Sequence, residues 1–162
     1  MIEAVHIPEE RKAVLIGRNG SVKKRLERMT RTSIRISFDV EIEGDSLDVL
    51  KAVEVVNAIA HGFTPSKAFL LLKDKFRLEV LEFRVSSPEE RKRIMARVIG
   101  RSGLARKNIE EKTKCAISAY EKSVSIIADE EHMIAAEAAV VSLLEGKSHG
   151  HAYKIAEKRK LK

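Results

Sequence analysis

Hydrophobic and polar positions along the chain predict short strands that alternate with amphipathic helices. Segments 1–7 and 76–85 are rich in Val, Ile, Leu and Phe and partly alternate apolar with polar residues, as half-buried strands do. A proline and two glutamates follow each segment, which is a helix-start signal with acids in the first turn. In segment 21–30 the apolar residues recur at i, i+4 and i+7, which predicts a helix.

The rest of the pattern predicts hairpins and closing helices. Alternating residues around Asp39 predict one hairpin, and segments 116–119 and 124–127 predict a second one around Glu121 and Lys122. Alanine- and valine-rich segments at 47–60 and 130–145 predict helices, the latter capped by Asp129. Segment 64–75 (TPSKAFLLLKDK) predicts a helical connector, and the segment after Gly146 resembles a second copy of it.

The chain contains the same unit twice. PEERK occurs at 8–12 and again at 88–92, and an Ile-Gly-Arg-x-Gly turn follows at 16–20 and 99–103. After the turn the matches lie 83 residues apart, and they pair Leu26 with Ile109, Glu27 with Glu110, Thr30 with Thr113, and Ile34 with Ile117. Before the turn the second copy is longer by three residues, which is close to one helical turn. We infer a duplicated supersecondary unit.

Each copy of the unit contains a basic block followed by an acidic block. Residues 17–35 carry a net charge of +6 and residues 36–63 a net charge of −5, while 91–114 and 115–146 carry +7 and −5, and the tail 147–162 carries +5. Two separate basic blocks in a chain of net charge +7 favour surfaces that face a polyanion.

The glycine turns predict a phosphate clamp. Two glycines three positions apart allow a sharp turn between helices and leave no side chain to keep a nucleic-acid backbone from the peptide groups. Exposed amides at the start of the following helix attract phosphates, and the Arg and Lys residues beside them add full charges. Two such turns would extend the footprint along one strand.

The order strand, helix, G-x-x-G, helix, Thr, strand resembles the KH domain, whose GXXG loop clamps four nucleotides of single-stranded RNA or DNA. Only some sixteen residues precede the first GXXG, so the resemblance is to the eukaryotic-type topology. It implies an α+β chain of two tandem type I KH domains (β-α-α-β-β-α each) with a helical connector. We expect the first domain with its connector at 1–75 and the second, with its basic tail, at 76–162.

The resemblance also implies an RNA-binding site in each unit. One departure is that the aliphatic residue three positions after the second glycine is replaced by Lys23 and Arg106, which predicts a more polar, phosphate-directed site. We expect base contacts from Ile16, Ile99 and the strand edges. The expected RNA-binding residues are Ile16, Gly17, Arg18, Asn19, Gly20, Lys23, Lys24, Arg35, Ile36, Ile99, Gly100, Arg101, Ser102, Gly103, Arg106, Lys107, Ala116, Ile117 and Ser118.

The tandem arrangement with these basic residues is similar to a narrower family, the archaeal relatives of the eukaryotic small-subunit assembly factor that partners the PIN-domain endonuclease. Membership implies binding of single-stranded RNA near the 3′ end of small-subunit rRNA during its maturation. It also implies contact with that endonuclease or with the alpha subunit of translation initiation factor 2.

Other functions are compatible with parts of the sequence. A general KH role in mRNA binding or RNA decay and a protein-docking adaptor remain alternatives. A nuclease would need magnesium at Asp39, Glu41, Glu43 and Asp45, but no such cluster recurs in the second copy. We therefore expect a cytoplasmic monomer with no enzymatic activity, cofactor, metal or membrane partner; the single cysteine, Cys115, fits a reducing compartment.

Overall fold

The computed structural model describes residues 1–160, with the side chains of residues 1–157. The chain divides into two compact units, Met1–Asp74 and Lys75–Lys162. Each unit has its own three-stranded antiparallel sheet and its own set of helices. Among the described residues, no helix combines the length and the apolar character needed to cross a membrane.

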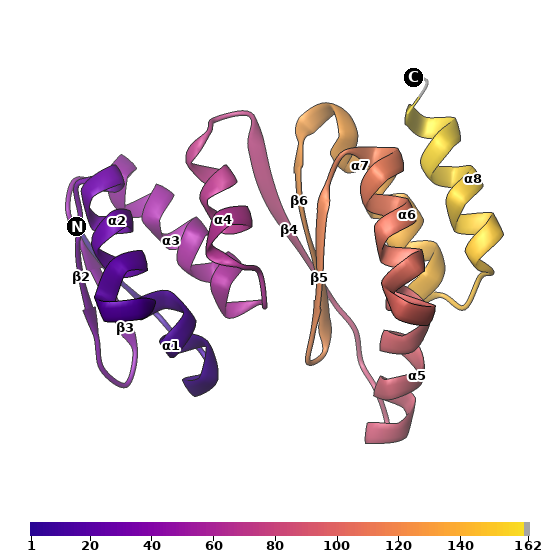
Figure 1. Cartoon of the computed structure of the whole chain (residues 1–162), viewed down its shortest axis with the longest axis horizontal. Helices are drawn as coiled ribbons and strands as arrows, with labels where there is room; N and C mark the ends of the chain where they lie inside the picture. Colours follow the sequence, from indigo (N-terminus) through magenta and orange to yellow (C-terminus); the bar gives the residue numbers. More distant parts are fainter. Residues whose placement is uncertain (161–162) are drawn as a thin grey trace. The chain divides into compact units, whose positions relative to one another are not determined.

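The first unit follows the order β-α-α-β-β-α. Its sheet has the strand order β1-β3-β2, so β2 is an edge strand, and helices α1, α2 and α3 lie on one face of that sheet (Figure 1). The elements are β1 (Ile2–Val5), α1 (Glu9–Ile16), the 3-10 turn η1 (Arg18–Gly20), α2 (Ser21–Thr30), β2 (Ser33–Ile36), β3 (Val40–Glu43) and α3 (Ser46–Ala60).

The second unit repeats this order with longer strands and a longer first helix. Its sheet has the order β4-β6-β5, which again leaves the strand after the second helix at an edge. The elements are β4 (Phe76–Glu82), α5 (Pro88–Ile99), the 3-10 turn η3 (Arg101–Gly103), α6 (Leu104–Thr113), β5 (Ala116–Tyr120), β6 (Ser123–Asp129) and α7 (Glu130–Leu144). The predicted α+β fold of two tandem units is therefore confirmed.

Each unit buries its own apolar core between the sheet and the helices, which accounts for the alternation in the strands and the helical spacing. Leu26 and Ile109, the matching residues of the second helices, are both fully buried, as are Ile42 of β3 and Ile126 of β6. Burial of such side chains contributes about 1.5–3 kcal/mol each. This packing fixes α2 and α6, and with them the glycine turns at their starts.

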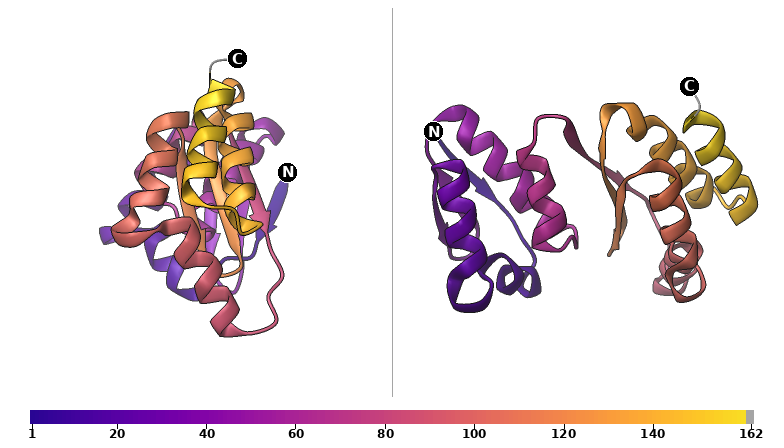
Figure 2. Two further views of the ribbon diagram at one scale, coloured as in Figure 1. Left: turned by 90° about the vertical axis from the view of Figure 1, so that its right-hand side faces the viewer. Right: turned by 45° about the horizontal axis from the view of Figure 1, so that its top comes forward.

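The segments that follow the closing helices differ between the units. The expected connector is short, with α4 (Pro65–Ala68) and the 3-10 turn η2 (Phe69–Leu72) packed on α3. The expected second copy is a full helix, α8 (His149–Lys160), which packs on α7 and α6 and buries Ala152 and Ala156 (Figure 2). The last two residues of the basic tail, 161–162, lie outside the described residues.

Candidate nucleic-acid interface

The two glycine turns have almost the same backbone. Gly17 has φ 74° and ψ 178°, and Gly100 has φ 76° and ψ 176°. Asn19 and Ser102 are both left-handed, with φ of 55° and 54°. Gly20 and Gly103 are left-handed as well, with φ of 74° and 78°. Because glycine adopts such positive φ angles without the strain that a Cβ brings, the first and last positions of each turn favour glycine.

The first and second glycine of each turn have different surroundings. A Cβ on Gly100 would lie 2.7 Å from both the Cβ and the backbone nitrogen of Ala105, so this glycine permits the close approach of the two helices. At Gly103 the nearest atom is the Cε of Lys107 at 3.9 Å, the flexible end of an exposed side chain. The second glycine therefore leaves its peptide open to a ligand.

The helices that start at the turns lack a side-chain N-cap. The N-cap residues of α2 and α6 are Gly20 and Gly103, and neither helix receives a capping bond from a side chain. By contrast, α5 and α7 are capped by Ser87 and Asp129, whose side chains accept from backbone N–H groups. The first amides of α2 and α6 therefore remain available to an anion, with the helix dipole favourable.

Cations surround each turn. Arg18 and Lys24 in the first unit and Arg101 and Lys107 in the second are exposed. None of the four side chains forms a hydrogen bond or ion pair with any residue in the described part of the chain. Asn19 and Ser102 are also exposed. Such unpaired cations next to open amides favour phosphate groups.

Lys23 and Arg106 are arranged differently from these cations. Lys23 Nζ lies 3.2 Å from Glu27 Oε1, and Arg106 Nε lies 3.8 Å from Glu110 Oε1, each pair being one helical turn apart. The second carboxylate oxygen of each glutamate accepts a 2.8 Å hydrogen bond from the backbone N–H of Ile34 or Ile117. In both units a glutamate thus connects the basic residue to the edge strand, a role that the sequence analysis did not assign to Glu27 and Glu110.

We call the glycine turn, the first turn of the following helix and the edge strand the GXXG face of each unit. Ile16 and Arg35 are exposed on it, and Ile36 and Ile99 are half-buried. Ala116, Ile117 and Ser118 are buried, with Ile117 in the core of the second unit. The side chains of these three residues are therefore not presented to solvent, and the strand offers its backbone edge instead.

One aromatic ring stands at the end of the edge strand in the first unit. Among the described Phe and Tyr side chains, Phe38 alone is exposed, at 78%. Its ring lies 5.9 Å from the His6 ring and 5.9 Å from Lys12 Nζ. Lys12 Nζ also donates to the Ser37 carbonyl (2.8 Å) and so ties α1 to this turn. No role for Phe38 follows from the sequence, because nothing in its spacing distinguishes an aromatic residue in a turn from one in the core.

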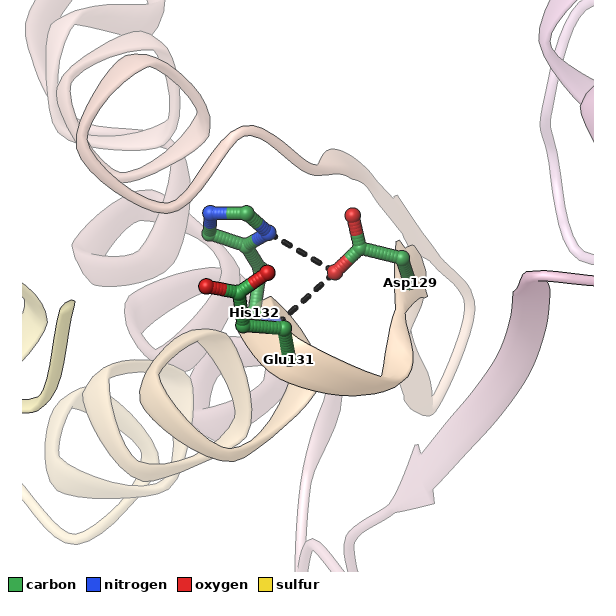
Figure 3. Close-up of side chains that lie close together, drawn as sticks. All are labelled: Asp129, Glu131 and His132. Carbon is green, nitrogen blue, oxygen red and sulfur yellow. Dashed lines mark hydrogen bonds and ion pairs between the residues drawn. The ribbon is translucent and has the colours of Figure 1, made fainter. Parts of the chain in front are cut away.

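Several acidic side chains outside the glycine turns have structural partners. Asp129, Glu131 and His132 place their ligand atoms within 4.8 Å of one another (Figure 3). Asp129 Oδ1 accepts from the His132 backbone N–H (2.9 Å) and contacts His132 Nδ1 (2.7 Å), so this group caps α7 as the sequence predicted. Burial acts to raise the pKa of Asp129, but the two hydrogen bonds from His132 outweigh it and lower that pKa. In the hairpin, Asp39 pairs with His6 and Glu41 with Arg35.

Comparison with known proteins bears on this geometry. Residues 76–161 match the eukaryotic-type KH domain (KH-domain type I), in a form specific to the second domain of PNO1. Residues 2–58 match the KH domain. The chain belongs to the type I KH family of RNA-binding proteins. The two G-x-x-G turns described above each lie within one of these matched segments.

Proteins similar to the whole tandem KH chain include the following archaeal ones. A KH domain-containing protein of Methanocaldococcus jannaschii is 38% identical over 170 residues, covering 99% of this chain and 75% of that protein. The crystal structure of Dim2p from Pyrococcus horikoshii is 36% identical with a TM-score of 0.88, covering 98% of this chain and 99% of that one. A crystal structure of a P. horikoshii a/eIF2alpha–aDim2p–rRNA complex contains a chain that is 37% identical with a TM-score of 0.90, covering 99% of this chain and 94% of that one.

Proposed function

We propose that this KH protein binds single-stranded RNA through both GXXG faces and acts in small ribosomal subunit assembly, near the 3′ end of small-subunit rRNA. The observation that carries the proposal is the twice-repeated open glycine turn, where uncapped amides and unpaired cations meet. Phosphates would bind to the amides at Gly17–Gly20 and Gly100–Gly103, with Arg18, Lys24, Arg101 and Lys107 adding charge.

Base recognition would come from the strand edges and from the apolar residues before each turn. Ile16 and Ile99 flank the loops, and Arg35 and Ile36 lie on the edge strand of the first unit. In the second unit, the backbone edge of 116–118 would meet the bases. Lys23 and Arg106 would contact the RNA while they remain paired with Glu27 and Glu110. Because each glutamate offsets part of the positive charge, these two residues would attract phosphate less strongly than unpaired cations.

The choice of rRNA rests on the similarity to Dim2p, whose P. horikoshii form was crystallised with rRNA and a/eIF2alpha. We extend those partners to this chain and include the PIN-domain endonuclease implied by the family resemblance. The alternatives are a general mRNA-binding or RNA-decay role and a protein-docking adaptor. The expected action is binding without chemistry, as is usual for KH modules.

The first test is RNA binding by the full chain, measured by fluorescence anisotropy on a labelled RNA with the 3′-terminal sequence of small-subunit rRNA and on a scrambled one. Arg101→Asp with Ser102→Asp should abolish binding, because it places negative charge at the open turn. The control is Lys147→Asp with Ser148→Asp, which makes the same change of three charge units in an exposed loop. An aspartate at 148 can still cap α8, where Ser148 Oγ now accepts from the His151 N–H.

The salt dependence gives a second readout of the same site. If four to six phosphates are neutralised, the logarithm of affinity should fall with the logarithm of salt concentration with a slope of about −3 to −4. Equal affinity for the scrambled RNA would leave KH binding in place and reject the rRNA assignment. Unchanged binding by the Arg101→Asp, Ser102→Asp variant would show that the clamp lies elsewhere.

A further inference from the structure

The duplicated PEERK motif has different surroundings in the two units. In the first unit, Arg11 Nε and one of its terminal nitrogens donate 2.7 Å hydrogen bonds to the carbonyls of Ile59 and Phe63, which anchors α1 to the end of α3. In the second unit the corresponding anchor is Arg97, which donates to the Leu143 carbonyl at 3.1 Å. A residue six positions after Arg91 has thus taken over the anchoring role.

The three additional residues before the second glycine turn account for this exchange. Helix α5 has 12 residues and α1 has 8, so the PEERK motif of the second unit lies about one turn further from the glycines. Arg91 makes no hydrogen bond to the described residues of the closing helix α7. Its half-buried side chain forms no hydrogen bond or ion pair with any described residue.

Arg91 instead lines a cavity of about 330 Å³ at the start of α5. The cavity lies between the β4–α5 loop, the first turn of α5 and the turn between β5 and β6, which meet at the same end of the second unit (Figure 1). Its lining residues are Val85, Ser86, Ser87, Pro88, Arg91 and Lys122.

The cavity is cationic. Lys122 is exposed, and its ammonium, like the Arg91 guanidinium, has no hydrogen-bond or ion-pair partner among the residues that the structure describes. None of the described lining residues is acidic. The nearby Glu90 carboxylate is held by the Oγ and backbone N–H of Ser86, both at 2.6 Å, and these bonds lower its pKa. Two unpaired cations converging on one cavity favour an anion with several oxygens.

We propose that this cavity binds a phosphate group, supplied by the RNA strand where it leaves the GXXG face of the second unit. The inference rests on the proposed function. Helix α5 leads from the cavity to the glycine turn, and Arg91 lies nine residues before Gly100, about 13 Å along the helix. Strand β5, which forms the other side of the GXXG face, ends at the turn that carries Lys122. A strand bound at the turn would thus place a flanking phosphate between Arg91 and Lys122.

Within the described residues, the first unit has no equivalent free pair, because its β2–β3 turn holds Ser37, Phe38 and Asp39 where the β5–β6 turn of the second unit carries Lys122. There Lys12 Nζ is tied to the Glu9 carboxylate and the Ser37 carbonyl, both at 2.8 Å, and Arg11 is used as an anchor. The phosphate cavity is therefore a property of the second unit that arises from the longer α5.

The test uses the full chain and the same labelled 3′-terminal RNA. Arg91→Gln with Lys122→Gln should weaken binding about tenfold and make the salt slope shallower by about 0.7 for each phosphate released. The control, Arg77→Gln with Lys147→Gln, removes the same charge from β4 and from the loop before α8, away from the cavity. In parallel, inorganic phosphate is titrated into the ¹⁵N-labelled protein, and the amide signals of Ser87, Arg91 and Lys122 should shift.

The outcomes separate this inference from the proposed function. Equal loss in both double variants, or no loss in the cavity variant, would overturn the RNA contact even though the wild-type protein binds RNA. If the wild-type protein bound no RNA, the proposed function would fail; phosphate-induced shifts confined to the cavity would then support a site for free phosphate. Absence of those shifts together with unchanged RNA affinity would overturn the cavity as a phosphate site altogether.

Discussion

Replacing the first glycine of the second turn should damage the fold, whereas replacing the second glycine should mainly affect RNA binding. Gly100 has φ 76° and ψ 176°, a region that is essentially restricted to glycine. A Cβ there would also lie 2.7 Å from the backbone nitrogen of Ala105, which cannot move aside as a flexible side chain could. Gly103, with φ 78° and ψ 12°, is in the ordinary left-handed region, and a Cβ there would make only ordinary van der Waals contacts with the side-chain ends of Lys107 (3.9 Å) and Arg106 (4.0 Å).

These two positions allow the cost of each substitution to be worked out separately. For Gly100→Ala, backbone strain costs about 1–3 kcal/mol and overpacking costs about another 1–3 kcal/mol. The sum is about 2–6 kcal/mol, a large share of the stability of a small domain. For Gly103→Ala only the left-handed conformation counts, at about 1–2 kcal/mol.

Native-state amide hydrogen exchange on the full chain measures this difference, because amides in the central strand β6 report opening of the second unit. Gly100→Ala should accelerate their exchange far more than Gly103→Ala does. Anisotropy with the 3′-terminal RNA should show weaker binding by Gly103→Ala at a smaller cost in protection than Gly100→Ala causes, since the new methyl group stands at the open peptide. Similar exchange rates in the two variants would refute the assignment of the first glycine to helix packing.

Two further predictions concern the glutamate in the second GXXG face and the cap of α7. Glu110→Ala removes the acceptor of the Ile117 N–H and the partner of Arg106, and should lower the free energy of unfolding by about 1–3 kcal/mol, measured by the same exchange experiment; unchanged protection would contradict the link. The hydrogen bonds from His132 lower the pKa of Asp129 although burial opposes them, so the stabilisation by its carboxylate is complete above its unfolded pKa of about 3.9 and is lost as the pH falls through the lowered pKa. Asp129→Asn should therefore destabilise the protein at neutral pH and not in strong acid, as followed by thermal unfolding at several pH values; a pH-independent difference would contradict this.

Much of the fold could be predicted because local signals agreed with one another. The prolines before the first helices, the glycines after them and the strand alternation each mark the end of an element, and the duplication provided every signal twice. The tail was harder to predict. The tail and the connector both follow a closing helix, but their structures differ. The tail forms α8, a helix of 12 residues, whereas the connector consists of the short helix α4 and the 3-10 turn η2.

The candidate site was predictable in its backbone and less so in its side chains. The spacing of the glycines was enough to locate the turns, since glycine is the residue that adopts the positive φ angles of their first and last positions at least cost. The ion pairs of Lys23 with Glu27 and of Arg106 with Glu110 were not predicted, although opposite charges four residues apart are known to stabilise a helix. The burial of 116–118 depends on packing between elements far apart in the sequence, which periodicity alone does not encode.

The two units share their glycine turns but differ in the residues beside them, and this difference would let the protein distinguish two segments of RNA. The glycine turns share their dihedral angles, uncapped amides and flanking cations, so they would hold any phosphate backbone in the same way. The units differ instead at the end of the GXXG face where the first helix begins. There the first unit has the Phe38 ring beside Lys12, which is hydrogen-bonded to Glu9 and Ser37. The second unit has Arg91 and Lys122, which line the cavity and have no ion-pair partner among the described residues. A common backbone clamp supplies affinity without selectivity, and discrimination between the segments must therefore arise from these divergent ends and from the edge strands.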